Sequence, residues 1–173
     1  MTAPARTDDP PTVRTRVAAI AATLARVVLG ILWINEGALK YHAGFGRADI
    51  LLVAQSTAQN PRVPDFYKFF TAHALGQAPD LFGFAVPLTE TCLGIALVLG
   101  ILTLPASLGS VLLLCSYWLA DQLIAQYPIM IVLSAAVAAF AMWASRYSLT
   151  AIVLHGRLRR VGESLPVAVR RWL

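Results

Sequence analysis

The stretch from Arg16 to His42 constrains this chain most, because it combines membrane-spanning length with ionisable side chains. It reads RVAAIAATLARVVLGILWINEGALKYH. A single helix of about 20 residues, rising about 1.5 Å each, spans the hydrocarbon of a bilayer. Arg26, Glu36 and Lys40 lie inside this stretch or at its edge. Ionisable groups at membrane depth are costly unless they face partners or water. The stretch therefore predicts a helix that faces the interior of a bundle and carries a candidate site.

The composition favours an integral membrane protein. The 173 residues are 58% hydrophobic and 13% charged, whereas soluble domains carry about 25% charged residues. The length suits one small bundle. The formal net charge is +5, and the basic residues gather near the two chain ends, as membrane orientation requires. The lipid bilayer is therefore the expected partner, and no nucleic acid is expected.

The apolar runs predict an all-α, integral membrane, antiparallel four-helix bundle. The four expected spans are about 17–41, 80–100, 105–123 and 128–148. The connection over residues 43–79 is too polar to cross the membrane, and it is longer than most loops. It contains two amphipathic stretches, Ala48–Ala58 and Pro64–Leu75. We expect interfacial amphipathic helices between helices 1 and 2 that cap one mouth of the bundle; a purely structural lid is an equally open interpretation.

The distribution of Arg and Lys predicts the orientation. Residues 1–13 are expected to be a flexible cytoplasmic tail, residues 14–156 the transmembrane domain, and residues 157–173 a basic amphipathic cytoplasmic tail. Basic residues precede the first span and follow the last, whereas the segments joining the second, third and fourth spans carry none. Cytoplasmic segments carry the excess of Lys and Arg. Both termini are therefore predicted to be cytoplasmic.

Two charged residues fall in the middle of the predicted membrane. Counting the rise per residue places Arg26 on helix 1 and Glu90 on helix 2 within about 7 Å of each other in depth. Pairing costs less than burying two isolated ions in hydrocarbon. We therefore predict a polar intramembrane pair between Arg26 and Glu90. It either locks the two helices together or forms a polar site for a quinone head group or a proton.

Further polar residues fall in a second, outer layer. The candidate quinone or ligand pocket comprises Trp33, Glu36, Lys40, Tyr117, Trp118 and Asp121. Ordinary interfacial residues are an alternative explanation of this layer. No metal site is expected from His42 and His73, which lie in or beside the long connection. No haem is expected either, because no histidine falls deep within a span.

The chain resembles the DoxX/DoxD family of small membrane proteins. The similarity rests on Arg26-x3-Gly30 followed by Gly37-x2-Lys40-Tyr41 in helix 1, and on Glu90-x3-Gly94 followed by Leu97-x-Leu99-Gly100 in helix 2. It covers roughly residues 20–150. The resemblance implies a four-helix bundle in the plasma (inner) membrane. It also implies a small-subunit role like that in thiosulfate:quinone oxidoreductase, or a membrane partner of redox or sulfur-metabolism proteins.

Three functional hypotheses follow. The first is a membrane subunit of a quinone-linked redox system, with a quinone as its ligand and no covalently bound cofactor. The second is a non-enzymatic membrane anchor or assembly partner for soluble redox proteins. The third is a small transporter or proton-conducting protein, against which the lack of a clear repeat or broken helix pair argues. A redox partner protein or a homo-oligomer is the expected assembly, and the sequence leaves open whether the chain is an enzyme.

Overall fold

The computed structural model describes residues 13–122 and 124–153, and this part of the chain is helical without strands. The elements are α1 (Val13–His42), α2 (Arg47–Gln59), α3 (Asp65–Phe70), the π-helix η1 (Thr71–Leu75), α4 (Pro79–Leu99), α5 (Thr103–Leu119), α6 (Tyr127–Ala139) and α7 (Ala141–Ala144). The predicted cytoplasmic tails over 1–13 and 157–173 lie almost entirely outside the described residues.

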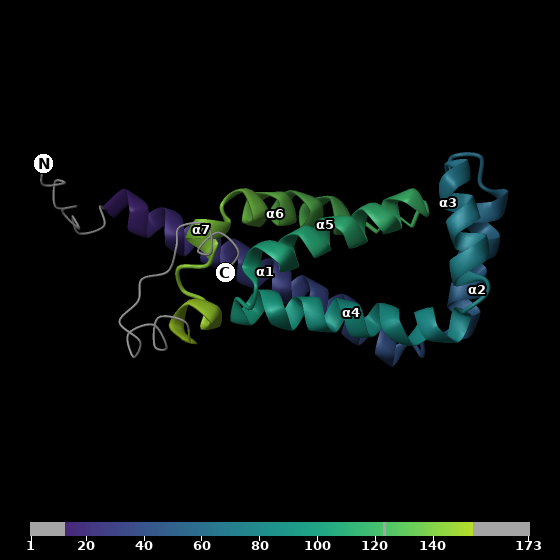
Figure 1. Ribbon diagram of the computed structural model, residues 1–173, viewed down its shortest axis with the longest axis horizontal. Coiled ribbons are helices and arrows are strands. Elements are labelled where there is room, and N and C mark those ends of the chain that lie inside the picture. Colours follow the sequence, from purple (N-terminus) through teal and green to yellow (C-terminus); the bar gives the residue numbers. More distant parts are fainter. Residues whose placement is uncertain (1–12, 123, 154–173) are drawn as a thin grey trace, which may run out of the picture.

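The long helices run along one axis of the molecule. Figure 1 shows α1, α4, α5 and α6 extended along the long axis, with α2 and α3 crosswise at one end and α7 toward the other. Helices α2, α3 and η1 contact one another, and α2 packs against α4. We refer to residues 47–75, which form α2, α3 and η1, as the cap.

Helix α1 packs most extensively against α4, and glycines set their separation. A Cβ atom built on Gly30 would lie 2.7 Å from the backbone oxygen of Gly94, and one built on Gly94 would lie 2.6 Å from that of Gly30. A Cβ on Gly37 would meet Pro87 and Thr91. The two helices are therefore antiparallel and nearly in backbone contact. Such close contact through small residues is common where membrane helices meet.

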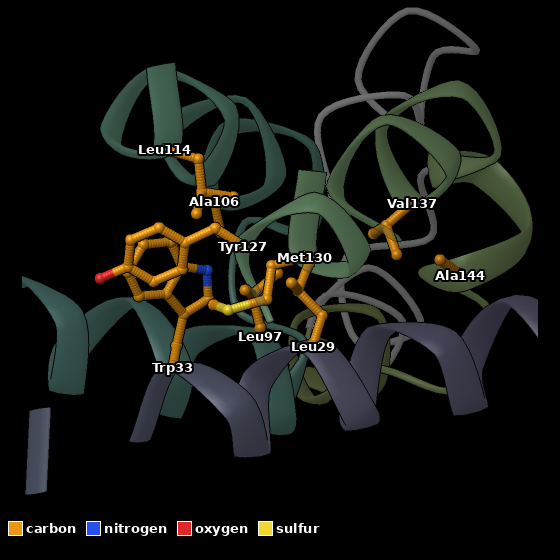
Figure 2. Packing of buried hydrophobic residues seen from close by; sticks show 9 residues of the cluster. All are labelled: Leu29, Trp33, Leu97, Ala106, Leu114, Tyr127, Met130, Val137 and Ala144. Carbon is orange, nitrogen blue, oxygen red and sulfur yellow. The ribbon is translucent and has the colours of Figure 1, made fainter. Parts of the chain in front are cut away.

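The core lies between α1 and the other long helices. Nine buried residues form it: Leu29, Trp33, Leu97, Ala106, Leu114, Tyr127, Met130, Val137 and Ala144 (Figure 2). The Trp33 indole N–H donates to Ser110 Oγ at 2.7 Å, and Ser110 and Ser134 share a hydrogen bond of 2.7 Å. These hydroxyls satisfy the indole, as a buried polar group requires, so Trp33 fastens α1 to α5 and α6.

The polarity of the molecule is the reverse of that of a soluble protein. Several charged and hydroxyl side chains are buried, among them Arg26, Glu36 and Glu90, whereas many large aliphatic and aromatic side chains face outward. Along α1 the exposed large hydrophobic side chains are Val13, Val17, Ile20, Leu24, Val28, Ile31, Leu39 and Tyr41. Of the described helices, α1 and α4 are long and apolar enough to cross a membrane, and α5 and α6 are shorter apolar helices. This arrangement suits a lipid environment.

The fourth predicted span differs from the sequence-based expectation. One helix was predicted over 128–148, but α6 ends at Ala139 and α7 begins at Ala141. Phe140 between them leaves helical geometry with φ −105° and ψ 26°. The alanine-rich sequence presents no bulk to oppose the bend, and Ala141 and Ala144 become buried where α7 contacts α1. Hydropathy alone carries no information about such a break.

Candidate functional site

Three charged side chains meet at the end of the bundle nearest the cap. Helix α1 supplies Glu36 and Lys40, which are one turn apart, and α4 supplies Glu90. Lys40 Nζ lies 2.6 Å from Glu90 Oε1 and 3.5 Å from Glu36 Oε2. We call Glu36, Lys40 and Glu90 the charge cluster. The helical repeat explains the Glu36–Lys40 pair, whereas the contact with Glu90 depends on how α1 packs against α4.

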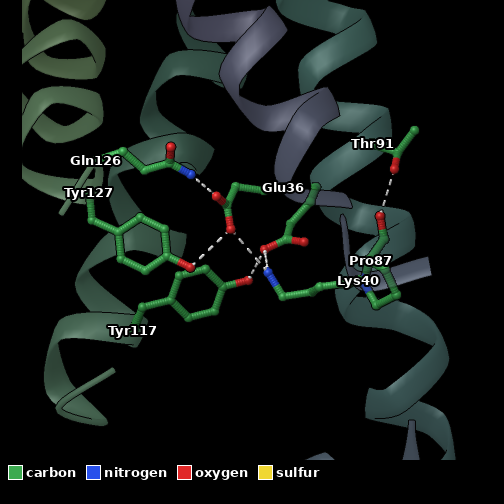
Figure 3. A network of polar contacts seen from close by, with 8 residues as sticks. Glu36, Lys40, Pro87, Thr91, Tyr117, Gln126 and Tyr127 are labelled. Carbon is green, nitrogen blue, oxygen red and sulfur yellow. Dashed lines mark hydrogen bonds and ion pairs between the residues drawn. The ribbon is translucent and has the colours of Figure 1, made fainter. Parts of the chain in front are cut away.

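Three neutral side chains donate further hydrogen bonds to the carboxylates. The hydroxyl of Tyr117 on α5 donates to Glu90 Oε1 at 2.6 Å. The Tyr127 hydroxyl donates to Glu36 Oε2 at 3.3 Å, and the amide of Gln126 donates to Glu36 Oε1. Figure 3 shows Tyr117, Tyr127 and Gln126 on one side of this network and Lys40 on the other. Four helices or their ends therefore converge on two carboxylates.

The carboxylates of this cluster are almost fully buried. Glu90 is 0% exposed and Glu36 is 3% exposed, while the Lys40 side chain retains 17% exposure. Glu90 Oε2 has no hydrogen-bond partner among the described residues. An unpaired charge in such surroundings is costly. Lys40 therefore supplies the counter-charge to both carboxylates, and it is the charged group through which the cluster meets its surroundings.

An aromatic cavity lies directly beside the charge cluster, with Lys40 on its wall. Its volume is about 260 Å³. Six aromatic side chains line it: Phe45, Tyr67, Phe70, Phe82, Tyr117 and Tyr127. The cap contributes Tyr67 and Phe70, so it forms part of the cavity wall. The volume lies just below the range of about 300–1,000 Å³ typical of drug-sized ligands. A small ring system therefore fits inside it.

The cap is held against the long helices by specific contacts. The Tyr67 hydroxyl and Ser116 Oγ are hydrogen-bonded at 2.7 Å, and burial raises the pKa of Tyr67 further above its ordinary value. Asp121 accepts from the Asn60 amide at 2.8 Å and pairs with Arg62 at 3.2 Å. These contacts fix one wall of the aromatic cavity to α5 and to the turn that follows it.

The predicted contact between Arg26 and Glu90 is not formed. Arg26 Nη1 donates to the carbonyl oxygen of Leu97 at 2.9 Å, and Nη2 donates to that of Tyr147 at 3.1 Å. The glycine register explains the difference. Since Gly30 lies against Gly94, Arg26 lies toward the end of α4, whereas Glu90 lies closer to the level of Gly37. Depth counting ignores this register, and Glu90 pairs with Lys40 instead.

The six residues of the predicted pocket separate into two groups. Lys40 and Tyr117 line the aromatic cavity, and Glu36 lies beside it in the charge cluster. Trp33 belongs to the core, Trp118 is 63% exposed, and Asp121 binds the cap. The prediction missed Gln126 and Tyr127. The described residues contain no group of three His, Cys, Asp or Glu side chains placed to hold a metal ion.

Comparison with known families identifies the chain at the level of its family. The family model described as DoxX matches residues 21–122, which is more than half of the 173 residues. The chain belongs to the DoxX family. Comparisons with curated proteins and with solved structures returned no match. Together with the exposed apolar surface, the family makes this a membrane protein.

The DoxX match covers most of the site but not all of it. Glu36, Lys40, Glu90 and Tyr117 lie inside the matched segment, so the charge cluster is built from the DoxX region alone. Tyr127, which completes the aromatic cavity and contacts Glu36, lies beyond it. Helix α6 therefore closes a site that the DoxX segment begins.

Proposed function

We propose that this DoxX-family protein is a multi-pass protein of the plasma membrane with both termini in the cytoplasm. Helices α1, α4 and α5 would each cross once, and α6 together with α7 would make the fourth crossing of an antiparallel bundle. The cap would lie at the outer interface, where exposed Phe66 and Phe69 suit the headgroup region. The Arg-rich chain ends support this orientation.

Thiol labelling from one side of the membrane tests the orientation. In a protein whose two cysteines, Cys92 and Cys115, are replaced by alanine, Leu52→Cys on the cap and Arg14→Cys at the start of α1 provide two probes. An impermeant thiol reagent added to intact cells should label Leu52→Cys and leave Arg14→Cys unlabelled. Equal labelling of both probes before the membrane is opened would contradict the orientation.

We further propose that the protein is a membrane subunit of a quinone-linked redox system that binds a quinone head group in the aromatic cavity. One observation carries this proposal: a cavity of about 260 Å³ walled by aromatic rings ends on Lys40, which two buried carboxylates hold in place. Lys40 would donate a hydrogen bond to a ring oxygen of the ligand, and the aromatic walls would stack on the ring. A bound quinone supplies two-electron exchange; the residues named here bind and orient it.

Ligand binding to the purified protein in lipid nanodiscs tests this function. A short-chain benzoquinone should bind to the unaltered protein, and Lys40→Met should weaken its binding at least tenfold. Lys68→Met on α3 is the matched control, because Lys68 does not line the aromatic cavity. Phe70→Ala, which alters the wall without touching the charge cluster, should also weaken binding. Thermal unfolding of each variant separates lost binding from lost folding.

The same assay separates the two leading hypotheses. Failure of the unaltered protein to bind any quinone would contradict the redox-subunit proposal. The anchor hypothesis would then predict a soluble redox protein that co-purifies stoichiometrically in mild detergent. If quinone binds, thiosulfate is the electron donor to test first, because the family resemblance implies it, and membranes carrying Lys40→Met should then reduce quinone more slowly than control membranes.

A further inference from the structure

The hydrogen-bonding groups around the aromatic cavity define which form of a ring ligand fits it. Lys40 has three ammonium N–H donors. Two face Glu36 and Glu90, at 3.5 Å and 2.6 Å from Nζ. The third has no oxygen partner among the described residues, and Lys40 lines the cavity. The site therefore has one donor to spare for a ligand.

The two tyrosines beside Lys40 offer the opposite kind of group. Tyr117 donates its hydroxyl hydrogen to Glu90, and Tyr127 donates its hydroxyl hydrogen to Glu36. Because both hydroxyl hydrogens point to carboxylates, each phenol oxygen can accept a hydrogen bond from a ligand but cannot donate one. The two rings stack with centroids 5.4 Å apart, and both line the cavity. The tyrosines therefore present acceptors, and their carboxylate partners hold them in that state.

We propose that the cavity selects the reduced, hydroquinone form of its ligand over the oxidised, carbonyl form. This inference rests on the proposed function and names the form of the ligand that the same site prefers. A ligand hydroxyl can accept from Lys40 Nζ and donate to a tyrosine oxygen at once. A carbonyl oxygen can only accept, so it leaves the tyrosine acceptors without a donor in a largely buried site, which weakens binding.

The charge of the cluster points to a neutral ligand. With both carboxylates ionised, two carboxylates and one ammonium give the charge cluster one formal negative charge, and both carboxylates are buried. A phenolate or another anion entering beside this cluster would meet net repulsion, which is strong where water is excluded. Neutral hydroxyl groups avoid that repulsion and supply the hydrogen that the tyrosine oxygens accept.

The test compares a short-chain benzoquinone with its hydroquinone, kept reduced without oxygen, on the protein in nanodiscs. The hydroquinone should bind about three- to tenfold more tightly, the effect of one neutral hydrogen bond. Tyr117→Phe and Tyr127→Phe should each reduce this preference, and the double variant should bind both forms equally. Tyr41→Phe on α1 is the control, because Tyr41 does not line the cavity.

The outcomes separate this inference from the proposed function. If the unaltered protein binds the benzoquinone as tightly as the hydroquinone, or more tightly, the selection is wrong and the quinone-site proposal stands. If it binds neither form, the proposed function itself fails. A preference that survives the double variant would also contradict the inference, because the tyrosine oxygens would not be its source.

Discussion

Lys40 Nζ lies 2.6 Å from Glu90 Oε1, so the last turn of α1 is tied by charge to the middle of α4. The two residues are 50 positions apart in sequence. The same ammonium lies 5.5 Å from the centroid of the Tyr117 ring, whose hydroxyl donates to the same Glu90 oxygen. Lys40 therefore takes part both in the packing of α1 against α4 and in the wall of the aromatic cavity.

Replacing Lys40 with methionine should destabilise the protein by about 3–5 kcal/mol, the usual cost of leaving a buried ionic partner uncompensated. Adding Glu90→Gln to the Lys40→Met protein should recover part of that loss, because it removes one unpaired carboxylate. Denaturation in detergent or nanodiscs gives both values. Arg47→Met should change stability by less than about 1 kcal/mol, because the Arg47–Asp80 pair is solvent-accessible at 60% and 74%.

The contact between α1 and α4 gives a second prediction. Gly30→Ala should destabilise the fold by about 1–3 kcal/mol, because the new Cβ would lie 2.7 Å from the backbone of Gly94 and force the helices apart. Gly109→Ala on α5 is the matched control. Its Cβ would meet only Leu93 Cδ1 at an ordinary 3.7 Å. Equal unfolding free energies for the two variants would contradict the proposed close packing.

The sequence predicted the candidate site in part, and the failures have physical causes. Glu36 and Lys40 were recognisable because an i,i+4 pair depends only on the helical repeat. The partner of Glu90 was predicted wrongly, because pairing between helices depends on the rotation and register of their packing. The close contacts made by Gly30, Gly37 and Gly94 set that register, and a hydropathy pattern contains no information about the register.

The fold was likewise predictable where it depends on a single segment, and not where it depends on how helices pack. The apolar runs located α1 and α4 closely, since length and hydropathy are properties of one segment. The break at Phe140 was missed because it arises where α7 settles on α1. Tyr127 lies just before the fourth predicted span, and only the packed structure brings it onto Tyr117 and Glu36. A residue that reaches a site from a helix distant in sequence has no recognisable pattern around it in the sequence.

Arg26 gives a third prediction, which separates structure from ligand binding. Its guanidinium donates to the carbonyls of Leu97 and Tyr147, near the end of α4 and after α7. Arg26→Met should lower stability by about 1.5–3 kcal/mol, the contribution of hydrogen bonds from a charged donor. Quinone or hydroquinone affinity should stay within about twofold of the unaltered protein, because Arg26 does not line the aromatic cavity. A large loss of affinity in a well-folded Arg26→Met protein would place Arg26 in the site.

The hydrogen bond between Tyr67 and Ser116 gives the last prediction, which concerns how the cap is held. It spans 2.7 Å between α3 and α5, and both of its residues line the aromatic cavity. A double-mutant cycle of Tyr67→Phe and Ser116→Ala should give a coupling energy of about 0.5–1.5 kcal/mol. The cycle of Tyr67→Phe with Ser107→Ala should be additive, because Ser107 Oγ donates within α5 to Leu104 and lies about 13 Å along the helix from Ser116. Hydrogen exchange in the cap should also rise in Tyr67→Phe while exchange in α1 and α4 does not, because this bond holds the cavity wall closed. Additivity in both cycles would instead mean that the ring packing of Tyr67 alone retains the cap.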